Sequence, residues 1–445
     1  MAIFHGSRQW VVPLTIHGTF TRLHKASSAL LFAFLLVVPW LRWKGEPLIL
    51  ADLATRRMVV LGQIFTPSDG VLIMLLALAA AFSLFLFTTV FGRIWCGYFC
   101  PQSVFMINLV HPIEAWIEGT RSERMRRDAA GWSFDRAWRK AAKWAAFAAV
   151  AVGVSMSFMG FFARTELLWT GQATPGNYAV VAFFSAVWMF DFTWFREQTC
   201  NLVCPYARFQ GALTDDHSLV ISYDVPRGEP RGKTARARGG CIDCKKCVVV
   251  CPQGIDIRDG FQLECIACGR CIDACTDVMT KLGHPTLVRY STQAADEGRG
   301  TRSWLRPRTL VYGGALTALL AGVVGVTVLR DAIEVQVDRA PGSLFVRDDD
   351  GFVRNTYMVH VTDRSSAEGE RTYAVAVDGL PDGSQVRSRP LTLTAGQRSS
   401  TPVVVRIPEA AAARTLPLVV TVRGTDGEAR HATTFKGPGA DAGKD

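Results

Sequence analysis

The feature that most constrains this chain is a doubled cysteine pattern between Cys241 and Cys275. Two runs follow each other, and each has the spacing C-x2-C-x2-C-x3-C. Thiolates are soft ligands that select iron–sulfur clusters, zinc or Cu(I). Whatever fold this segment adopts must therefore gather two sets of sulfur atoms into compact sites.

This spacing is found in bacterial proteins that hold two [4Fe–4S] clusters, in which the fourth cysteine of each run binds the cluster of the other run. We therefore predict that one cluster is bound by Cys241, Cys244, Cys247 and Cys275, and the other by Cys265, Cys268, Cys271 and Cys251. Disulfide bonds or zinc sites would explain the doubled spacing less well. Disulfides do not require two copies of it, and zinc usually takes two C-x2-C pairs. Thr276 stands where Pro would usually follow the second run, which bears on the local turn and not on the ligands.

Composition indicates a membrane protein. Hydrophobic residues make up 49% of the chain, yet Lys and Arg exceed Asp and Glu, 49 to 39. Soluble proteins seldom combine these properties, whereas membrane proteins with basic cytoplasmic loops do. Apolar runs predict five transmembrane helices, at about 26–43, 71–91, 141–162, 178–195 and 309–330. The alternative, buried core helices of a soluble protein, is disfavoured by runs of about 20 residues with few charges.

Charge predicts the orientation. The loops 92–140 and 196–308 are crowded with Lys and Arg, whereas the loops near Leu50 and Gln172 hold few. By the positive-inside rule, the N-terminus and the cysteine-rich insert are cytoplasmic and the tail is exported. We find no cleavable signal, and we interpret the Arg-rich stretch 227–238 as a linker that faces lipid, not nucleic acid.

The residues after the fifth span predict a different kind of domain. Short alternating stretches, such as Asn355–Val361, are separated by Asp-Gly turns over about 100 residues. This pattern is typical of an all-β immunoglobulin-like sandwich, although none of the twelve cysteines lies in it. We expect a membrane domain at 1–205, a 2[4Fe–4S] ferredoxin domain at 206–308, the fifth span, a periplasmic sandwich at 331–436 and a disordered tail at 437–445.

Two further cysteine pairs end the second and fourth spans. Cys96 and Cys100 precede Pro101, and Cys200 and Cys204 precede Pro205, so both are C-x3-C-P motifs. Residues four apart share one face of a helix, so each pair could present two sulfurs to one point, and the two pairs could form one four-sulfur site. Cu(I), zinc or an iron–sulfur cluster could bind there, and buried structural cysteines remain the alternative.

Other polar residues near these motifs carry weaker signals. Arg93, Arg196 and Arg208 could lower thiol pKa values, but we favour the interpretation that they anchor the membrane interface. Asp191 lies inside a span near its end, where it could be functional or face the interface. Isolated histidines are expected to be mostly solvated and not copper ligands: His5, His17, His24, His111 and His217.

With these parts in order, the chain resembles the family of the cytochrome oxidase accessory protein CcoG, also called FixG or RdxA. The resemblance covers nearly the whole length and rests on the two cluster runs, the C-terminal sandwich and three motifs, at 92–102, 196–210 and 222–232. It implies a cupric reductase that reduces Cu(II) to Cu(I) during assembly of the copper site of cbb3-type cytochrome oxidase. Electrons would pass from the two clusters to copper at or near the expected catalytic and copper-binding residues, Cys96, Cys100, Cys200 and Cys204.

The resemblance also implies partners and a location. The expected partners are a cytoplasmic electron donor, copper chaperones or transporters, and cbb3 oxidase subunits, and the expected location is the bacterial inner membrane. A homodimer is one state that the chain could adopt. Two alternatives stay open: a quinol-linked ferredoxin subunit of the periplasmic nitrate reductase type, and a non-enzymatic scaffold for oxidase assembly.

Overall fold

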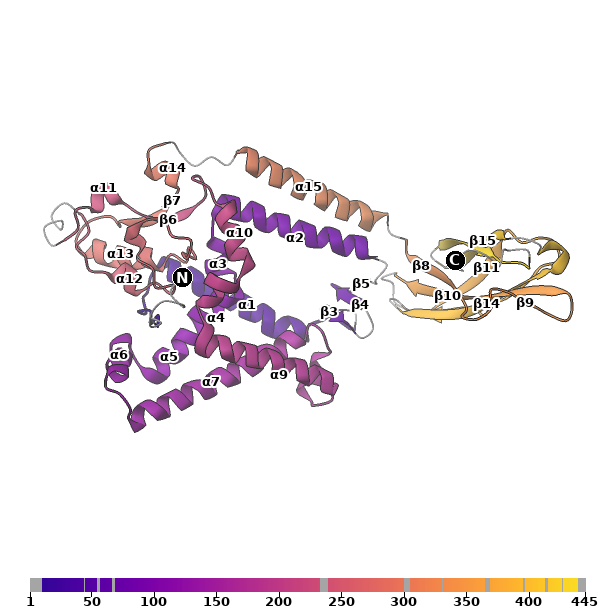
Figure 1. Cartoon of the computed structure of the whole chain (residues 1–445), viewed down its shortest axis with the longest axis horizontal. Coiled ribbons are helices and arrows are strands. Elements are labelled where there is room, and N and C mark those ends of the chain that lie inside the picture. Colours follow the sequence, from indigo (N-terminus) through magenta and orange to yellow (C-terminus); the bar gives the residue numbers. More distant parts are fainter. Residues whose placement is uncertain are drawn as a thin grey trace. The chain divides into compact units, whose positions relative to one another are not determined.

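The computed structural model describes residues 10–43, 45–53, 57–65, 69–232, 239–299, 305–329, 331–364, 369–394, 397–412, 415–425 and 427–438. The chain divides into two compact units (Figure 1). The first comprises Met1–Arg42, Pro47–Thr55 and Gly70–Val323, and the second comprises Trp43–Glu46, Arg56–Asp69 and Val324–Asp445. His5 and most of the tail predicted to be disordered, 439–445, lie outside the described residues.

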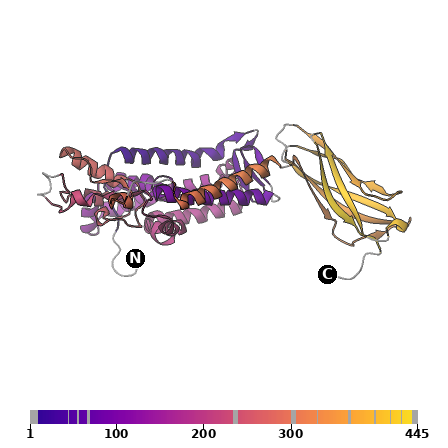
Figure 2. The same ribbon diagram turned by 90° about the horizontal axis from the view of Figure 1, so that it is seen from above.

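Among the described residues, five helices are long and apolar enough to cross a membrane, as predicted. They are α1 (Thr19–Val37) continued by the short turn Val38–Trp40, α2 (Gly70–Phe91), α7 (Phe134–Met159), α9 (Pro175–Phe190) continued by the π-helix η4 (Asp191–Phe195), and α15 (Pro307–Val328). Figure 2 shows the helices of the first unit side by side from a second direction. Aromatic rings join neighbours, for example Phe158 with Phe184 between α7 and α9, and Phe82 with Tyr312 between α2 and α15.

The first span begins at Thr19, earlier than the apolar run predicted. In the added turns Thr21 and His24 are buried, and His24 hydrogen-bonds the side chain of Asn108, which also donates to Ser28 of the predicted run. At the helix start, Asp273 accepts hydrogen bonds from the backbone and hydroxyl of Thr21, both at 2.7 Å. A carboxylate at a helix N-terminus stabilises the helix through its dipole. The cysteine-rich segment thus helps to fix where the first span begins.

The ferredoxin segment is small and lies at one end of the long helices (Figure 1). Its antiparallel strands β6 (Val220–Tyr223) and β7 (Val288–Ser291) enclose the two cysteine runs in sequence. Each run leads into a helix, α12 (Lys246–Val249) in the first and α13 (Arg270–Lys281) in the second. Its buried core mixes aliphatic residues with cysteine sulfurs, so packing and cofactor sites share one interior.

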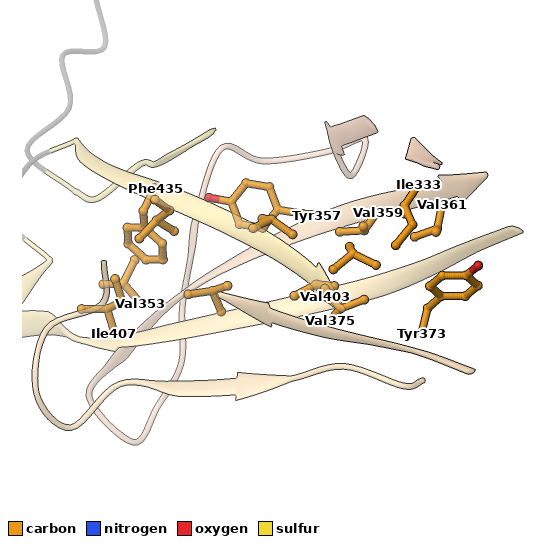
Figure 3. Close-up of a cluster of buried hydrophobic side chains, with 14 of the residues drawn as sticks. Ile333, Val353, Tyr357, Val359, Val361, Tyr373, Val375, Val403, Ile407 and Phe435 are labelled. Atoms are coloured by element: carbon orange, nitrogen blue, oxygen red, sulfur yellow. The ribbon is translucent and has the colours of Figure 1, made fainter. Parts of the chain in front are cut away.

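The second unit contains a two-sheet sandwich that confirms the predicted all-β architecture. One sheet has the order β12-β14-β10-β8 with β9 beside β10, and the other has the order β13-β11-β15-β16. The strands are β8 (Ile333–Arg339), β9 (Val346–Arg347), β10 (Phe352–Asp363), β11 (Arg371–Asp378), β12 (Gln385–Arg387), β13 (Leu391–Leu393), β14 (Arg398–Pro408), β15 (Leu416–Gly424) and β16 (Gly427–Phe435). Along β10 every second side chain is buried, and these side chains meet those of the facing sheet (Figure 3).

Candidate functional site

The eight cysteines of the two runs line two neighbouring cavities. One cavity is lined by Cys241, Cys244, Cys247 and Cys275, together with apolar side chains of α13 and β7. The other is lined by Cys251, Cys265, Cys268 and Cys271, with Cys247 at the shared wall. These are the crossed sets that the spacing predicts, and we propose them as the ligands of two clusters. Four thiols around an apolar chamber are the donor set that a [4Fe–4S] cluster uses.

The backbone of the two runs is curled in the same way. The residues on both sides of the middle cysteine have positive φ: Asp243 and Lys245 around Cys244, and Ala267 and Gly269 around Cys268. For a residue other than glycine this conformation costs about 1–2 kcal/mol. Successive residues of opposite handedness turn their N–H groups toward one concave side, which favours an anionic group there. The repeated strain supports a role for both loops in holding negatively charged clusters.

Burial alone would keep these thiols protonated. It raises the pKa of Cys247 to about 12 and that of Cys268 to about 11. Burial also raises the pKa of Cys251, although the backbone N–H groups of residues 253–255 act in the opposite direction. A thiol must lose its proton to bind a metal, so the bound iron has to offset the cost of burying the thiolate charge.

The two C-x3-C-P pairs lie at breaks between helices and not on one helical face, which corrects the prediction. Cys96 belongs to the short helix α3 (Ile94–Tyr98), and Cys100 precedes α4 (Pro101–Phe105). Cys200 belongs to the π-helix η5 (Thr199–Val203), and Cys204 precedes α10 (Pro205–Leu213). Both second cysteines have extended backbones, with ψ of 123° and 112°, because a following proline disfavours the helical conformation.

Two glutamines tie the pairs to each other. The Gln210 Oε1 atom accepts hydrogen bonds from the Arg93 guanidinium at 2.7 Å and from the Cys96 thiol at 3.3 Å. In return, Gln102 donates to the carboxylate of Asp191 and to the carbonyl oxygen of Arg196. Each motif therefore holds the segment that leads into the other, which brings their cysteines together.

All four cysteines of these motifs, Cys96, Cys100, Cys200 and Cys204, form one group, which we name the thiol quartet. Burial raises the pKa of Cys200 above its usual range, and the neighbouring Cys100, Cys96 and Cys204 raise it further. Burial likewise raises the pKa of Cys96 to about 11, although Arg93 opposes this. The sequence predicted the meeting of the pairs; the glutamine ties were missed because no local pattern marks them.

The predicted roles of the flanking charges need correction. Arg93 and Arg196 are buried, whereas Arg208 is exposed as an interface residue would be. Asp191 is also buried and accepts hydrogen bonds from Gln102 and Thr199. These residues therefore belong to the interior of the site and do not anchor its surface.

A buried ion network lies beside the quartet. Glu114 accepts from Arg196 at 2.5 Å and also pairs with Arg124 and Lys143. Burial raises the pKa of Glu114, but the hydrogen bond from His111 and the charges of the arginines outweigh it and hold the pKa well below its usual range. His24 is buried, and the side chain of His111 is only 10% exposed, contrary to the prediction that both are solvated.

The quartet packs directly on the second cluster loop. Cys96 and Cys268 belong to one buried group of side chains with Ile266. The Tyr98 hydroxyl donates to the carbonyl oxygen of Cys268 at 3.2 Å. At Gly97 an added Cβ atom would lie 2.6 Å from the carbonyl oxygen of Ile266, so this close approach requires glycine. Packed side chains therefore connect Cys96 of the quartet with Cys268 of the second cluster loop.

The sequence leaves Cu(I), zinc and an iron–sulfur cluster open as the group that the quartet binds. Among the described residues, no three His, Cys, Asp or Glu side chains converge closely enough for one metal ion. That statement covers the eight ferredoxin cysteines too, as expected for a cubane, in which each thiolate binds a different iron atom.

Comparisons with known proteins agree with this architecture. A model described as a 4Fe-4S dicluster domain matches residues 195–293, a 4Fe-4S binding domain matches 73–107, and an IG-like fold at the C-terminal of FixG matches 323–438. The protein RdxB of Cereibacter sphaeroides is 35% identical over 98% of both chains. The nitrogen fixation protein FixG of Rhizobium meliloti is 35% identical over 84% of this chain and 80% of its own.

A more distant likeness covers the membrane and ferredoxin parts. The ferredoxin-type protein NapH of Haemophilus influenzae is 26% identical over 46% of this chain and 68% of its own. Membrane helices, iron–sulfur domains and the C-terminal sandwich together identify the chain as a membrane iron–sulfur electron-transfer protein that belongs to the FixG, RdxA and RdxB family.

Proposed function

We propose that this chain is a cupric reductase, which reduces Cu(II) to Cu(I) for the copper site of a cbb3-type cytochrome oxidase. The observation that carries the proposal is the packed route from the cluster loops to the thiol quartet at the ends of two spans. The eight ferredoxin cysteines hold two clusters, and copper is the substrate, reduced at or next to the quartet. The resemblance of the whole chain to the CcoG family supports copper as the acceptor.

Each turnover moves one electron. When bound, a [4Fe–4S] cluster supplies single electrons at a potential set by its charge, hydrogen bonds and exposure. Cu(II) gains the electron and becomes Cu(I), and a low-potential one-electron donor restores the reduced protein. Cys244 is exposed and marks the end of the route at which that donor would dock. Sulfur ligands near the other end favour Cu(I), so they stabilise the product.

The orientation and partners are part of the proposal. The basic loops support a cytoplasmic location for the ferredoxin segment, where clusters are assembled and thiols stay reduced. The sandwich then lies in the periplasm, where copper chaperones or transporters and oxidase subunits are the proposed partners.

The experiment that tests the function is Cu(II) reduction by the purified full-length protein in detergent. The clusters are reduced with dithionite, excess reductant is removed, and Cu(II) is added with a chelator specific for Cu(I). We expect Cu(I) to form in step with the recovery of visible cluster absorbance, because each reduced cluster is oxidised as it gives an electron to Cu(II). A double variant, Cys100→Ser with Cys204→Ser, should lose Cu(I) formation yet keep both ferredoxin clusters.

Two other outcomes would contradict the cupric reductase function. If the reduced clusters persist in the presence of Cu(II) but are oxidised by a quinone, the protein is a quinone-linked carrier, as its likeness to NapH would allow. If neither acceptor oxidises them while the cluster-free protein still supports oxidase assembly, the scaffold alternative holds.

A further inference from the structure

We propose that the thiol quartet holds a third [4Fe–4S] cluster, with Cys96, Cys100, Cys200 and Cys204 as its ligands. This refines the reducing end of the proposed function and rests on that function only for the direction of electron flow. Copper would then be reduced beside the quartet and not on its sulfurs.

The first support is the number and placement of the sulfurs. Two equivalent helix breaks each supply two cysteines, and cross-ties through Gln102 and Gln210 hold the breaks together. Cys200 is close enough to each of the other three cysteines for their charges to interact. Yet among the described residues no three of the four thiols converge on one ion position. The eight ferredoxin cysteines likewise show no three thiols around one ion position within the described residues. This is expected, because a cubane spreads its ligands over four iron atoms.

The second support comes from buried donors that lack an acceptor. Within the part of the chain that the structure describes, the Nε2 atom of Gln210 and the hydroxyl of Ser103 are buried without a hydrogen-bond partner. Gln210 contacts the Cys96 thiol through the same amide, and Ser103 lines a small cavity with Cys200. Buried donors without partners are costly. Cluster sulfur atoms beside the quartet would offer acceptors to both.

The third support is the local charge. Arg93 is buried, and its guanidinium donates at 2.7 Å to the Gln210 Oε1 atom that also accepts from the Cys96 thiol. One buried guanidinium therefore lies beside the quartet. Four buried thiolates need positive charge nearby, and iron atoms together with Arg93 would supply it.

The family comparison is independent of this geometry. The 4Fe-4S binding domain model matches residues 73–107, a stretch in which Cys96 and Cys100 are the only cysteines. Two cysteines cannot complete a cluster, and the structure shows where the other two come from. The dicluster match begins at residue 195 and so includes Cys200 and Cys204 beside the eight ferredoxin cysteines.

The test counts iron and identifies its ligands without measuring activity. Full-length protein purified anaerobically should contain about twelve irons per chain, against about eight if only the ferredoxin sites are filled. The double variant Cys96→Ser with Cys200→Ser should lose about one third of the iron. Its dithionite-reduced electron paramagnetic resonance spectrum should still show the two ferredoxin clusters. Asn201→Ala, between the two cysteines of one motif, is the matched control and should keep all the iron.

A second measurement avoids variants that could fail to fold. In the native protein, quartet thiols bound to iron should resist alkylation by iodoacetamide, and removal of iron by a chelator should expose them, as followed by peptide mass spectrometry. About eight irons with quartet thiols that react freely, or with one bound copper that protects them, would overturn the proposal. Cu(II) reduction is scored separately, so a failure of the third cluster and a failure of the reductase function are distinguishable.

Discussion

At the scale of single residues, Gly97 decides how closely two redox sites approach. Its missing side chain lets α3 lie against the loop that carries Cys268, with a Cβ position only 2.6 Å from the carbonyl oxygen of Ile266. The hydroxyl of Tyr98 fixes the same contact from the next position. A side chain at Gly97 would clash with backbone atoms of Ile266 and Cys268, so the two segments would have to move apart. No change of side-chain rotamer could relieve that clash.

We therefore predict that Gly97→Val slows electron transfer without removing the ferredoxin clusters. The oxidation of dithionite-reduced protein by Cu(II), followed by stopped-flow absorbance, should become several times slower, while the iron in the two ferredoxin sites stays constant. Gly313→Val is the control, because its added Cβ atom would have no neighbour within 4 Å. Equal rates for the variant and the wild-type protein would show that this contact is not on the route.

Residue identities also mark what the sequence could predict. Cysteine ligands can be recognised from their spacing in the sequence, because cluster geometry restricts how far apart ligands can lie along a turn. Gln102 and Gln210 give no such signal, since their partners are on distant segments. Arg93 and Arg196 were interpreted as surface charges because burial depends on the partners that fold around them.

At the scale of elements, α5 (His111–Glu118) turns its acidic side chains inward, because Glu114 and Glu118 are buried whereas Trp116 is exposed. Glu114 is fully buried and joins α5 to Arg196 and to Lys143 of α7. Removal of one member of a buried ion network leaves a buried charge unpaired, which lowers the free energy of unfolding by about 3–5 kcal/mol. The network explains why α7 begins at Phe134, before its apolar run: its first turns bind α5.

Glu114→Gln should lower the free energy of unfolding by about 3–5 kcal/mol at neutral pH, as measured by thermal or denaturant unfolding in detergent. The pKa of Glu114 is lowered in the folded state, so its stabilising effect is complete above the ordinary carboxyl pKa of about 4.3 and is lost as the pH falls below it. The difference between variant and wild-type protein should shrink accordingly in acid. Glu123→Gln, in the exposed capping box of α6 (Arg121–Ala129), should have a much smaller effect.

The ends of elements were harder to predict than their existence. Hydropathy located all five spans, because about 20 apolar residues leave few alternatives. It missed the start of α1, since Thr21 and His24 look like loop residues until Asp273 and Asn108 of later segments bind them. Likewise, C-x3-C suggested one helical face, and the prolines instead divide each pair between two helices.

At the scale of the whole molecule, the sandwich has its own core, built around Tyr357, Tyr373 and Phe435 (Figure 3). Both sheets contribute to it, and its stability does not depend on disulfides because the segment has no cysteine. We expect residues 331–436 to fold as an isolated domain with cooperative unfolding. Phe435→Ala should then cost about 3–5 kcal/mol in denaturant unfolding, whereas truncation of the exposed Val346 should change little. A molten, non-cooperative fragment would contradict this.

The orientation can be tested with the same cysteine-free domain. Glu370→Cys places an exposed thiol in the sandwich, and we expect a membrane-impermeant maleimide to label it in intact spheroplasts. Trp132→Cys, in the exposed turn before α7, should be labelled only after lysis. The reverse pattern would place the ferredoxin segment outside the cytoplasm and would contradict the proposed topology.

The order of the cysteines along the chain has a consequence for how the protein is made. Cys96 and Cys100 leave the ribosome well before Cys200 and Cys204, and the crossed ferredoxin sets are complete only when Cys275 has been synthesised. No four-cysteine site therefore exists until the fourth span has been translated. Delivery of iron and sulfide must wait for a late stage of synthesis, and a ribosome that stalls in the third span would leave a membrane-inserted chain with unprotected thiols.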